Sequence, residues 1–183
     1  MAIKDSATLV IGSGNYFLAP VGTAAPADLT TIPVTWDNIG HTSIEDIMTW
    51  ASDGGEATVL GTLQNAALRT SYSKRTESFT IQLQQFDEDS LKLYFGSNSS
   101  VDTDGWLAVP GSPAPTLQAF LAVYVDGENI FAVWAPKAEI LRGDDIDLSD
   151  TTSLASLPIS VTPVQYGTNT FPYKVKALGD TTE

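Results

Sequence analysis

Two apolar segments separated by a short polar turn constrain the fold more than any other feature of this sequence. Residues 117–125 (LQAFLAVYV) and 130–135 (IFAVWA) flank residues 126–129 (DGEN), and Asp-Gly is a favoured pair in tight turns between antiparallel strands. Both segments are apolar at consecutive positions, as in a strand that is covered on both faces. The sequence therefore predicts a buried β-hairpin, with one face on the core and the other on a helix or another subunit.

The rest of the chain also favours β structure. Thr, Ser, Val, Gly and Pro are abundant while Lys, Glu and Arg are scarce, a mixture that suits short strands joined by turns. Phe79, Ile81 and Leu83 alternate with polar residues, a pattern typical of a half-buried strand. The polar positions of that strand are uncharged: Ser78, Thr80, Gln82 and Gln84. Two more strands are expected at residues 138–148 and 157–162.

One short helix is predicted at about residues 88–95. Asp87 is a good N-cap, and Phe86 and Leu91 stand at the positions of a hydrophobic staple. Gly96 provides the left-handed residue that commonly ends a helix. A helix of this length is not stable alone, so we expect it to pack on a sheet.

Three segments have no firm periodicity. Residues 20–35 contain three prolines and predict an irregular arm. Residues 44–51 fit a helix and a strand equally well. Residues 52–73 are small and polar, and a segment this long without a pattern is typical of a functional loop or a long hairpin.

Composition excludes several classes of protein. The chain has 183 residues, which suits one domain over residues 1–183, and a net charge of −13, which argues against tight binding to DNA phosphates. It has no Cys and one His, so disulfide scaffolds, thiol nucleophiles and multi-His metal sites are excluded. No apolar run reaches the ~20 residues needed to cross a bilayer, and residues 1–6 lack the layout of a signal peptide. We expect an acidic globular protein made in the cytosol, with no membrane partner.

No group of residues predicts catalysis. His41, the only imidazole, has no nucleophile or orienting carboxylate nearby in the sequence. The acidic run at residues 144–150 lacks the Gly and the distal Glu of a calcium loop, so solvated charge is the preferred interpretation. We therefore predict no catalytic residue, no metal and no cofactor. Trp36 and Trp106 lie in loops rich in Pro and Gly, and an exposed pair of this kind suggests a carbohydrate-binding surface as an alternative.

Several stretches resemble the major tail proteins, or tail tube proteins, of long-tailed non-contractile bacteriophages. These stretches are residues 14–23 (GNYFLAPVGT), residues 36–43 (WDNIGHTS), and the strand and helix from Phe79 to Phe95 with the loop that follows. The resemblance covers most of residues 10–165. Its motifs consist of structural rather than catalytic residues.

The resemblance implies a mainly β fold: a small β-sandwich or half-barrel with one short flanking helix. It also implies a structural virion protein of the phage tail, assembled in the host cytoplasm. Six copies would close into a ring around a continuous β-barrel, and rings would stack into a tube. A tape measure protein would fill the tube during assembly, tail terminator and tail tip proteins would contact it, and double-stranded DNA would pass through it at ejection without sticking.

The resemblance further implies that three segments bridge successive rings: an N-terminal arm at about residues 1–35, the loop at 52–73 and a C-terminal arm at about 165–183. We expect the loop to become ordered only on stacking. The candidate contacts between rings are Val59, Leu60, Leu63, Leu68, Arg69, Lys74 and Arg75, the three cations being attracted to an acidic partner surface. The uncharged face of Ser78, Thr80, Gln82 and Gln84 is the candidate lumen face.

Two alternatives to a tail tube subunit stay open at this point. One is a carbohydrate- or receptor-binding β module built on Trp36 and Trp106. The other is a different part of the virion, such as a capsid decoration or tail completion protein.

Overall fold

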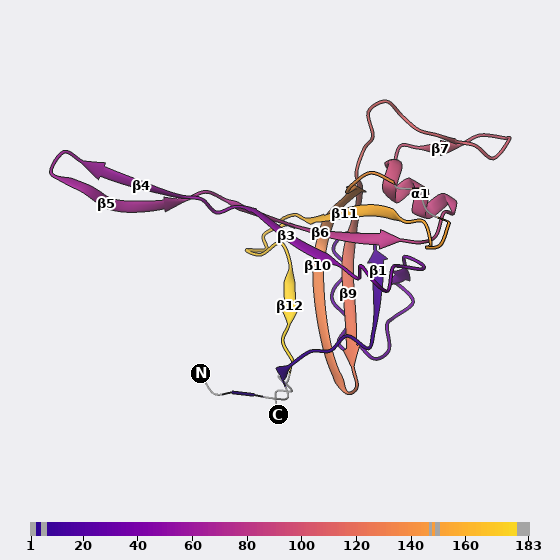
Figure 1. Cartoon of the computed structure of the whole chain (residues 1–183), viewed down its shortest axis with the longest axis horizontal. Coiled ribbons are helices and arrows are strands. Elements are labelled where there is room, and N and C mark those ends of the chain that lie inside the picture. Colours follow the sequence, from indigo (N-terminus) through magenta and orange to yellow (C-terminus); the bar gives the residue numbers. More distant parts are fainter. Residues whose placement is uncertain (1–2, 5–6, 147, 149–150, 179–183) are drawn as a thin grey trace.

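The computed structural model describes residues 3–4, 7–146, 148 and 151–178, and it is mainly β, as the sequence predicts (Figure 1). Its helix and strands are, in chain order, β1 (Ser13–Ala19), β2 (Asp37–Asn38), β3 (Thr49–Gly54), β4 (Ala57–Thr62), β5 (Asn65–Tyr72), β6 (Arg75–Leu83), α1 (Glu88–Phe95), β7 (Ser100–Val101), β8 (Leu107–Ala108), β9 (Thr116–Asp126), β10 (Asn129–Arg142), β11 (Leu157–Pro163) and β12 (Lys174–Lys176).

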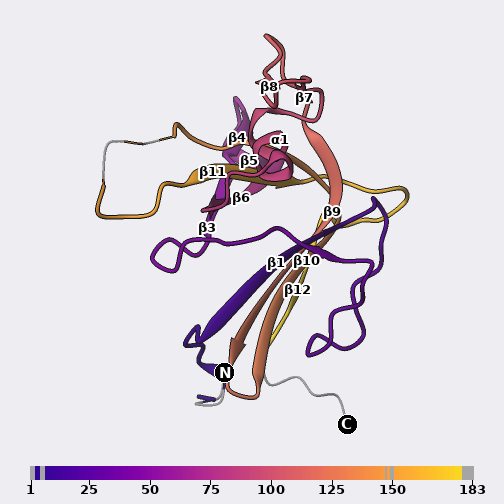
Figure 2. The same cartoon turned by 90° about the vertical axis from the view of Figure 1, so that its right-hand side faces the viewer.

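The largest sheet is antiparallel and strongly bent. Its strands follow the order β2-β1-β9-β10-β11-β6-β3, and β12 pairs with β10 away from this path. In Figure 1, β3, β6 and β11 run across the direction of β1, β9 and β10, so the sheet folds over on itself. Figure 2 shows β1, β9, β10 and β12 side by side in one half of this fold. The architecture is that of a β-sandwich made from one continuous sheet.

Strand β10 joins the two halves of the sheet. It pairs with β9 from Asn129 to Ile140, and its other edge pairs first with β12 and then with β11. The register with β9 shifts between Ala135 and Ala138, and Pro136 stands in this bulge, where the ladder needs no N–H from it. The sequence predicts separate strands at 130–135 and 138–148. That division is wrong, because the bulge lets one strand continue through the proline.

The predicted apolar hairpin is confirmed as β9 and β10. Asp126 pairs with Asn129, and Gly127 between them has a φ of 59°, the left-handed value that a two-residue hairpin turn requires. The side chains of β9 alternate between two buried faces. One face contributes Phe120 and Tyr124 to the main core, and the other contributes residues such as Leu121 to a second cluster.

The main core lies between the two halves of the folded sheet. Phe79 of β6, Phe120 of β9 and Tyr16 of β1 form a stack, with ring centroids 6.0 Å apart for Phe79–Phe120 and 6.4 Å apart for Tyr16–Phe120. Burial of such aromatic side chains supplies much of the hydrophobic stabilisation of a small domain. The alternating apolar residues of β6 and β11 face this core, as the sequence predicts.

The second face of the β1–β9–β10 half is covered by the chain's own irregular segment. Leu29 and Trp36 pack on it, and the Trp134 indole N–H donates to the Thr23 carbonyl oxygen at 3.1 Å. The expectation that a helix or another subunit covers this face is therefore wrong for the part beneath Trp36. The N-terminal arm predicted at residues 1–35 is interrupted by a strand. Ser13–Ala19 form β1, which pairs with β9 at every residue.

The predicted helix is confirmed as α1. The Asp87 carboxylate accepts from the Ser90 backbone N–H at 2.9 Å, and the Gly96 N–H donates to the Lys92 carbonyl oxygen at 2.9 Å. Hydrogen bonds from Ser90 and from the Gln85 amide hold the pKa of Asp87 below its usual value. The helix packs against β10 and β11 through Leu93 and Tyr94.

Candidate assembly surfaces

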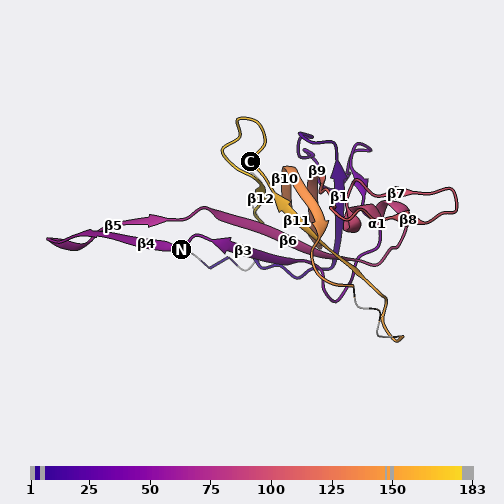
Figure 3. The same cartoon turned by 90° about the horizontal axis from the view of Figure 1, so that it is seen from above.

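A two-stranded ribbon projects from the folded sheet. Strands β3 and β6 pair from Thr49–Thr80 to Gly54–Arg75, and β4 and β5 continue the ribbon to a turn at Leu63 (Figures 1 and 3). At about 3.3 Å per residue, it reaches about 45 Å beyond Phe79. The segment at 52–73, for which the sequence left a loop and a long hairpin open, is therefore a long hairpin. The expectation that it orders only on stacking is wrong, because its strands are paired within one chain.

The outer hairpin, residues 57–72, exposes every residue to solvent. Leu63 at the turn is fully exposed, and Tyr72 is 71% exposed. An isolated two-stranded hairpin is marginally stable in water, and apolar side chains gathered on an exposed surface mark an interaction site. The predicted contacts Val59, Leu60, Leu63 and Leu68 all lie on this hairpin. The hairpin is therefore a surface suited to a partner.

The two faces of the outer hairpin differ. Cross-strand pairing puts Val59 and Tyr72 on one face, which is mostly apolar, and Leu60, Arg69 and Ser71 on the other. This separation means that the hairpin can present an apolar surface to one neighbour and a cationic surface to another.

The outer hairpin together with the start of β6, residues 57–76, is basic within an acidic chain. Residues 57–76 hold three of the nine basic residues and none of the 22 acidic ones. The three cations, Arg69, Lys74 and Arg75, make no ion pair among the described residues, where the ion pairs present are Lys92–Glu88 and Arg142–Asp145. Unpaired cations on an exposed element favour an acidic partner.

An aromatic cluster anchors the base of the ribbon. Tyr173 lies edge-on to Trp50 and Phe79, with ring centroids 5.4 and 5.7 Å away. Glu77 accepts from the Trp50 indole N–H at 2.8 Å and from the Ser52 hydroxyl at 3.0 Å. Burial, helped by the Glu77 charge, raises the pKa of Tyr173. The direction of the ribbon is therefore set by packing against the C-terminal segment and the core.

The large sheet is open at its ends. Strand β3 pairs with β6 on one side and with no described strand on the other. At the opposite end, β2 covers β1 only at Phe17 and Leu18, and the Ile39 N–H donates to the Tyr16 carbonyl oxygen at 3.1 Å, which leaves the outer edge of residues 13–15 without a strand. Exposed edges of this kind are templates for pairing with another chain.

The uncharged face predicted on β6 is half-buried and points away from the core. Ser78, Thr80, Gln82 and Gln84 alternate with buried residues. Thr80 pairs with Ser160 of β11 and with Thr49 of β3, which extends the uncharged face over three strands. The pairing brings the predicted residues together on one surface.

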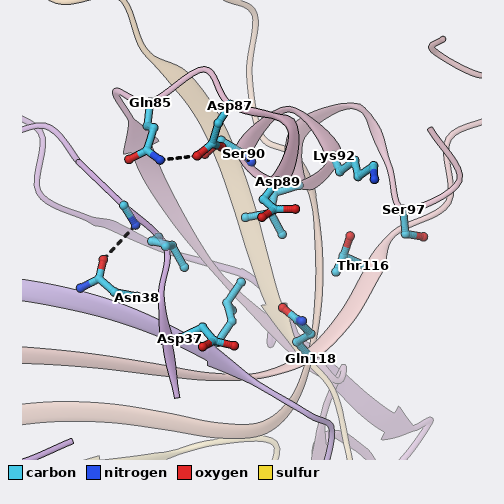
Figure 4. A pocket seen from close by; sticks show the side chains of 14 residues that line it. Asp37, Asn38, Gln85, Asp87, Asp89, Ser90, Lys92, Ser97, Thr116 and Gln118 are labelled. Carbon is cyan, nitrogen blue, oxygen red and sulfur yellow. Dashed lines mark hydrogen bonds between the residues drawn. The ribbon is translucent and has the colours of Figure 1, made fainter. Parts of the chain in front are cut away.

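A groove of about 440 Å³ lies between α1, the β1–β2 end of the sheet and β9. Figure 4 shows Asp37 and Gln118 on one side and Asp89 of α1 across from them. Asp37 and Asp89 are exposed and have no hydrogen-bond partner among the described residues. The side-chain oxygen of Gln118 is buried and has no donor there. This groove could not be predicted from the sequence, because its residues come from separate elements.

The two tryptophans of the carbohydrate-binding alternative do not form a platform. Trp106 is 75% exposed on the loop between β7 and β8, but Trp36 is 5% exposed and packs beneath the sheet. The expectation that both are exposed is wrong for Trp36. Its Pro-rich surroundings suggested a solvent-facing loop, whereas that loop folds back on the sheet.

The described residues contain no group of three or more His, Asp or Glu side chains placed to hold a metal ion. Asp147 and Asp150 of the acidic run lie outside the described residues, as do residues 179–183, which we expect to fray. No helix in the described part of the chain is long and apolar enough to span a membrane.

An open-edged β-sandwich with a projecting, exposed hairpin has surfaces through which a structural protein can contact other chains. Comparison with known proteins identifies the family: the sequence matches the family described as "Phage tail tube protein" over residues 1–175, and the chain belongs to this family. It is a structural subunit of a phage tail tube and a component of the virion. The family is not a known class of enzyme.

Two relatives are named as major tail proteins of phages. The chain is 34% identical over 175 residues to a protein named Major tail protein Gp23 of Mycobacterium phage D29, and 35% identical over 175 residues to the Gp23 of Mycobacterium phage L5. Each match covers 88% of this chain and 87% of the relative. These matches favour a tail tube subunit over a capsid decoration or tail completion protein.

Proposed function

We propose that six copies of this chain close into a ring and that rings stack into the tail tube, the conduit for DNA at ejection. In this proposal residues 1–183 act as one tail tube domain. The observation that carries it is the combination of an unpaired edge at each end of the sheet with an exposed hairpin that is not buried by any other described part of the chain. Membership of the tail tube family supports it.

Ring closure rests on the two open edges. The outer edge of β3 in one copy pairs with the outer edge of β1 that β2 leaves uncovered in the next, so that the sheets join into a barrel. Such a contact is heterologous, because it joins two different surfaces. The ring closes if the rotation from one copy to the next is one sixth of a full turn.

Stacking rests on the outer hairpin and the terminal segments. Val59, Leu60, Leu63 and Leu68 lose water on docking to a neighbouring ring, and Arg69, Lys74 and Arg75 meet its acidic surface. The chain outside the hairpin is strongly acidic, which supports this assignment. Further contacts between rings come from the N-terminal residues, at about 1–12, and from the C-terminal arm, at about 165–183.

The uncharged face of Ser78, Thr80, Gln82 and Gln84 lines the lumen. An uncharged polar wall offers DNA no cation to bind, and the net charge of −13 per copy repels phosphates, so the polymer slides through. The tape measure protein occupies the same space during assembly, and tail terminator and tail tip proteins bind the two ends of the tube.

Electron microscopy and light scattering test the proposal. The purified chain is examined at rising concentration, alone and with the tail proteins co-expressed, and the proposal expects sixfold rings that stack without a fixed limit. A chain that stays a compact monomer under all these conditions overturns it. Rings of another order overturn the sixfold closure, and rings that never stack favour a different virion part.

A further inference from the structure

We propose that the groove between α1, the β1–β2 end of the sheet and β9 receives the cationic face of the outer hairpin from a second copy of this chain. This inference rests on the proposed function and adds the acceptor site to it. The occupant is the face of residues 57–72 that carries Leu60, Arg69 and Ser71.

The groove offers what this face lacks within its own chain. Asp37 and Asp89 are carboxylates with no hydrogen-bond or ion-pair partner among the described residues, and the buried Gln118 oxygen has no donor. Arg69 has five N–H donors and no acid near it in the sequence. A guanidinium from another copy can donate to carboxylate and amide oxygens of this kind.

The local electrostatics favour a cation in the groove. The N-terminus of α1 carries a partial positive charge of about half a unit, but Asp87, Glu88 and Asp89 outweigh it. Among the described residues that line the groove the one cation is Lys92, which is paired with Glu88 at 2.5 Å. The net charge facing an incoming side chain is therefore negative.

The hairpin and the groove lie at opposite ends of the molecule, so the same contact can repeat from copy to copy. Figure 1 shows the hairpin at one end of the molecule and α1 with β1 at the other. A hairpin that docks into the groove of the next copy leaves its own groove free for a third copy. Contacts between two different surfaces generate open assemblies with no fixed number of copies. Stacking of rings requires a contact of this kind.

Engineered disulfides test the assignment, because the chain has no Cys of its own. The test variant carries Ser71→Cys on the cationic face and Thr116→Cys in the groove, so every charge is kept. After oxidation during assembly, we expect a ladder of covalent oligomers on a non-reducing gel. Disulfides between identical positions are controlled by Ser71→Cys alone and Thr116→Cys alone, because a chain with one thiol can give dimers at most.

Two matched variants control the test. Thr70→Cys with Thr116→Cys moves the thiol to the opposite face of the hairpin, and Ser71→Cys with Glu128→Cys moves the acceptor to the exposed β9–β10 turn. Both are expected to give at least tenfold less ladder. Normal tubes with no excess ladder from the test variant overturn the groove as acceptor and leave the proposed function standing. Failure of the unsubstituted chain to form tubes overturns the proposed function, and the acceptor site with it.

A charge exchange gives an independent readout. Arg69→Glu and Asp89→Lys are each expected to shorten the tubes, and the double variant is expected to recover length, because the ion pair is restored in reverse. If the double variant is as defective as the sum of the single variants, these two residues do not meet and the assignment is wrong.

Discussion

Shortening the hairpin is the change that best separates an effect on assembly from an effect on the stability of the folded chain. The structure shows where to cut: Gly54 and Arg75 are directly paired, so an Asn-Gly pair replacing residues 55–74 would connect them as a two-residue hairpin turn. The strands β3 and β6, the aromatic cluster at the base and the whole core remain. We expect a folded chain that forms rings and does not stack.

The expected change in the free energy of unfolding follows from burial and loop closure. No residue between 57 and 72 is buried, and exposed residues away from special features contribute within about 0.5 kcal/mol each way. The cut halves the loop length about three times, and each halving lowers the closure cost by about 0.6 kcal/mol, so the stabilisation has a ceiling of about 2 kcal/mol. The weak pairing within the hairpin is lost and offsets part of this. The net change therefore lies between about zero and 2 kcal/mol in favour of folding.

Urea unfolding and electron microscopy measure the two halves of this prediction. Ile81→Ala is the control for the fold, because Ile81 is fully buried and such truncations cost about 2–5 kcal/mol. A shortened chain that loses more than about 2 kcal/mol would show that the hairpin is part of the fold. A shortened chain that still forms tubes of normal length would refute its role in stacking.

Three further predictions concern the cap, the tryptophans and salt. Asp87→Ala is expected to destabilise the fold by about 1 kcal/mol in urea unfolding at pH 7. Hydrogen bonds lower the pKa of Asp87 in the folded chain. The stabilisation that its carboxylate gives is therefore complete above the unfolded pKa and is lost as pH falls through the folded pKa. In acid, the alanine variant and the parent should have the same free energy of unfolding. Trp36→Ala is expected to cost about 3–5 kcal/mol and Trp106→Ala less than about 0.5 kcal/mol, and equal losses would contradict the difference in burial. Tubes are expected to shorten between ~0.1 and ~1 M salt, where the screening length falls from about 10 to 3 Å, while the thermal midpoint of the monomer hardly changes; unchanged tube length would argue against a charged contact.

Local signals in the sequence account for the elements that were predicted correctly. The β9–β10 hairpin follows from two apolar segments around Asp-Gly, α1 follows from the Asp87 cap, and β6 follows from strict alternation. Each of these depends on neighbours within a few residues. Leucines in the otherwise polar segment of 52–73 have no local reason to be there, and the structure exposes them, but their role as contacts between rings stays a prediction.

What the sequence did not predict depends on contacts between distant segments. Trp36 is buried because the loop around it docks on β9 and β10, and nothing in its neighbours signals this. Strand β10 continues past Pro136 because a bulge accommodates the proline. The groove combines Asp37, Asp89 and Gln118, which are unremarkable singly and become a site only through the fold.

A charged docking contact suits a tube better than a large apolar one. A copy with a broad apolar patch would associate before its ring was complete. One hairpin contact combines a few apolar side chains with ion pairs that are worth about 0–1 kcal/mol each when exposed, so it is weaker than a broad apolar patch. In a closed ring the same contact repeats around the circumference, and once one hairpin has docked the others bind at high effective concentration. Weak single contacts therefore make stacking depend on prior ring closure. The order of assembly follows from the strength of the contact, and the stability of the tube follows from its repetition.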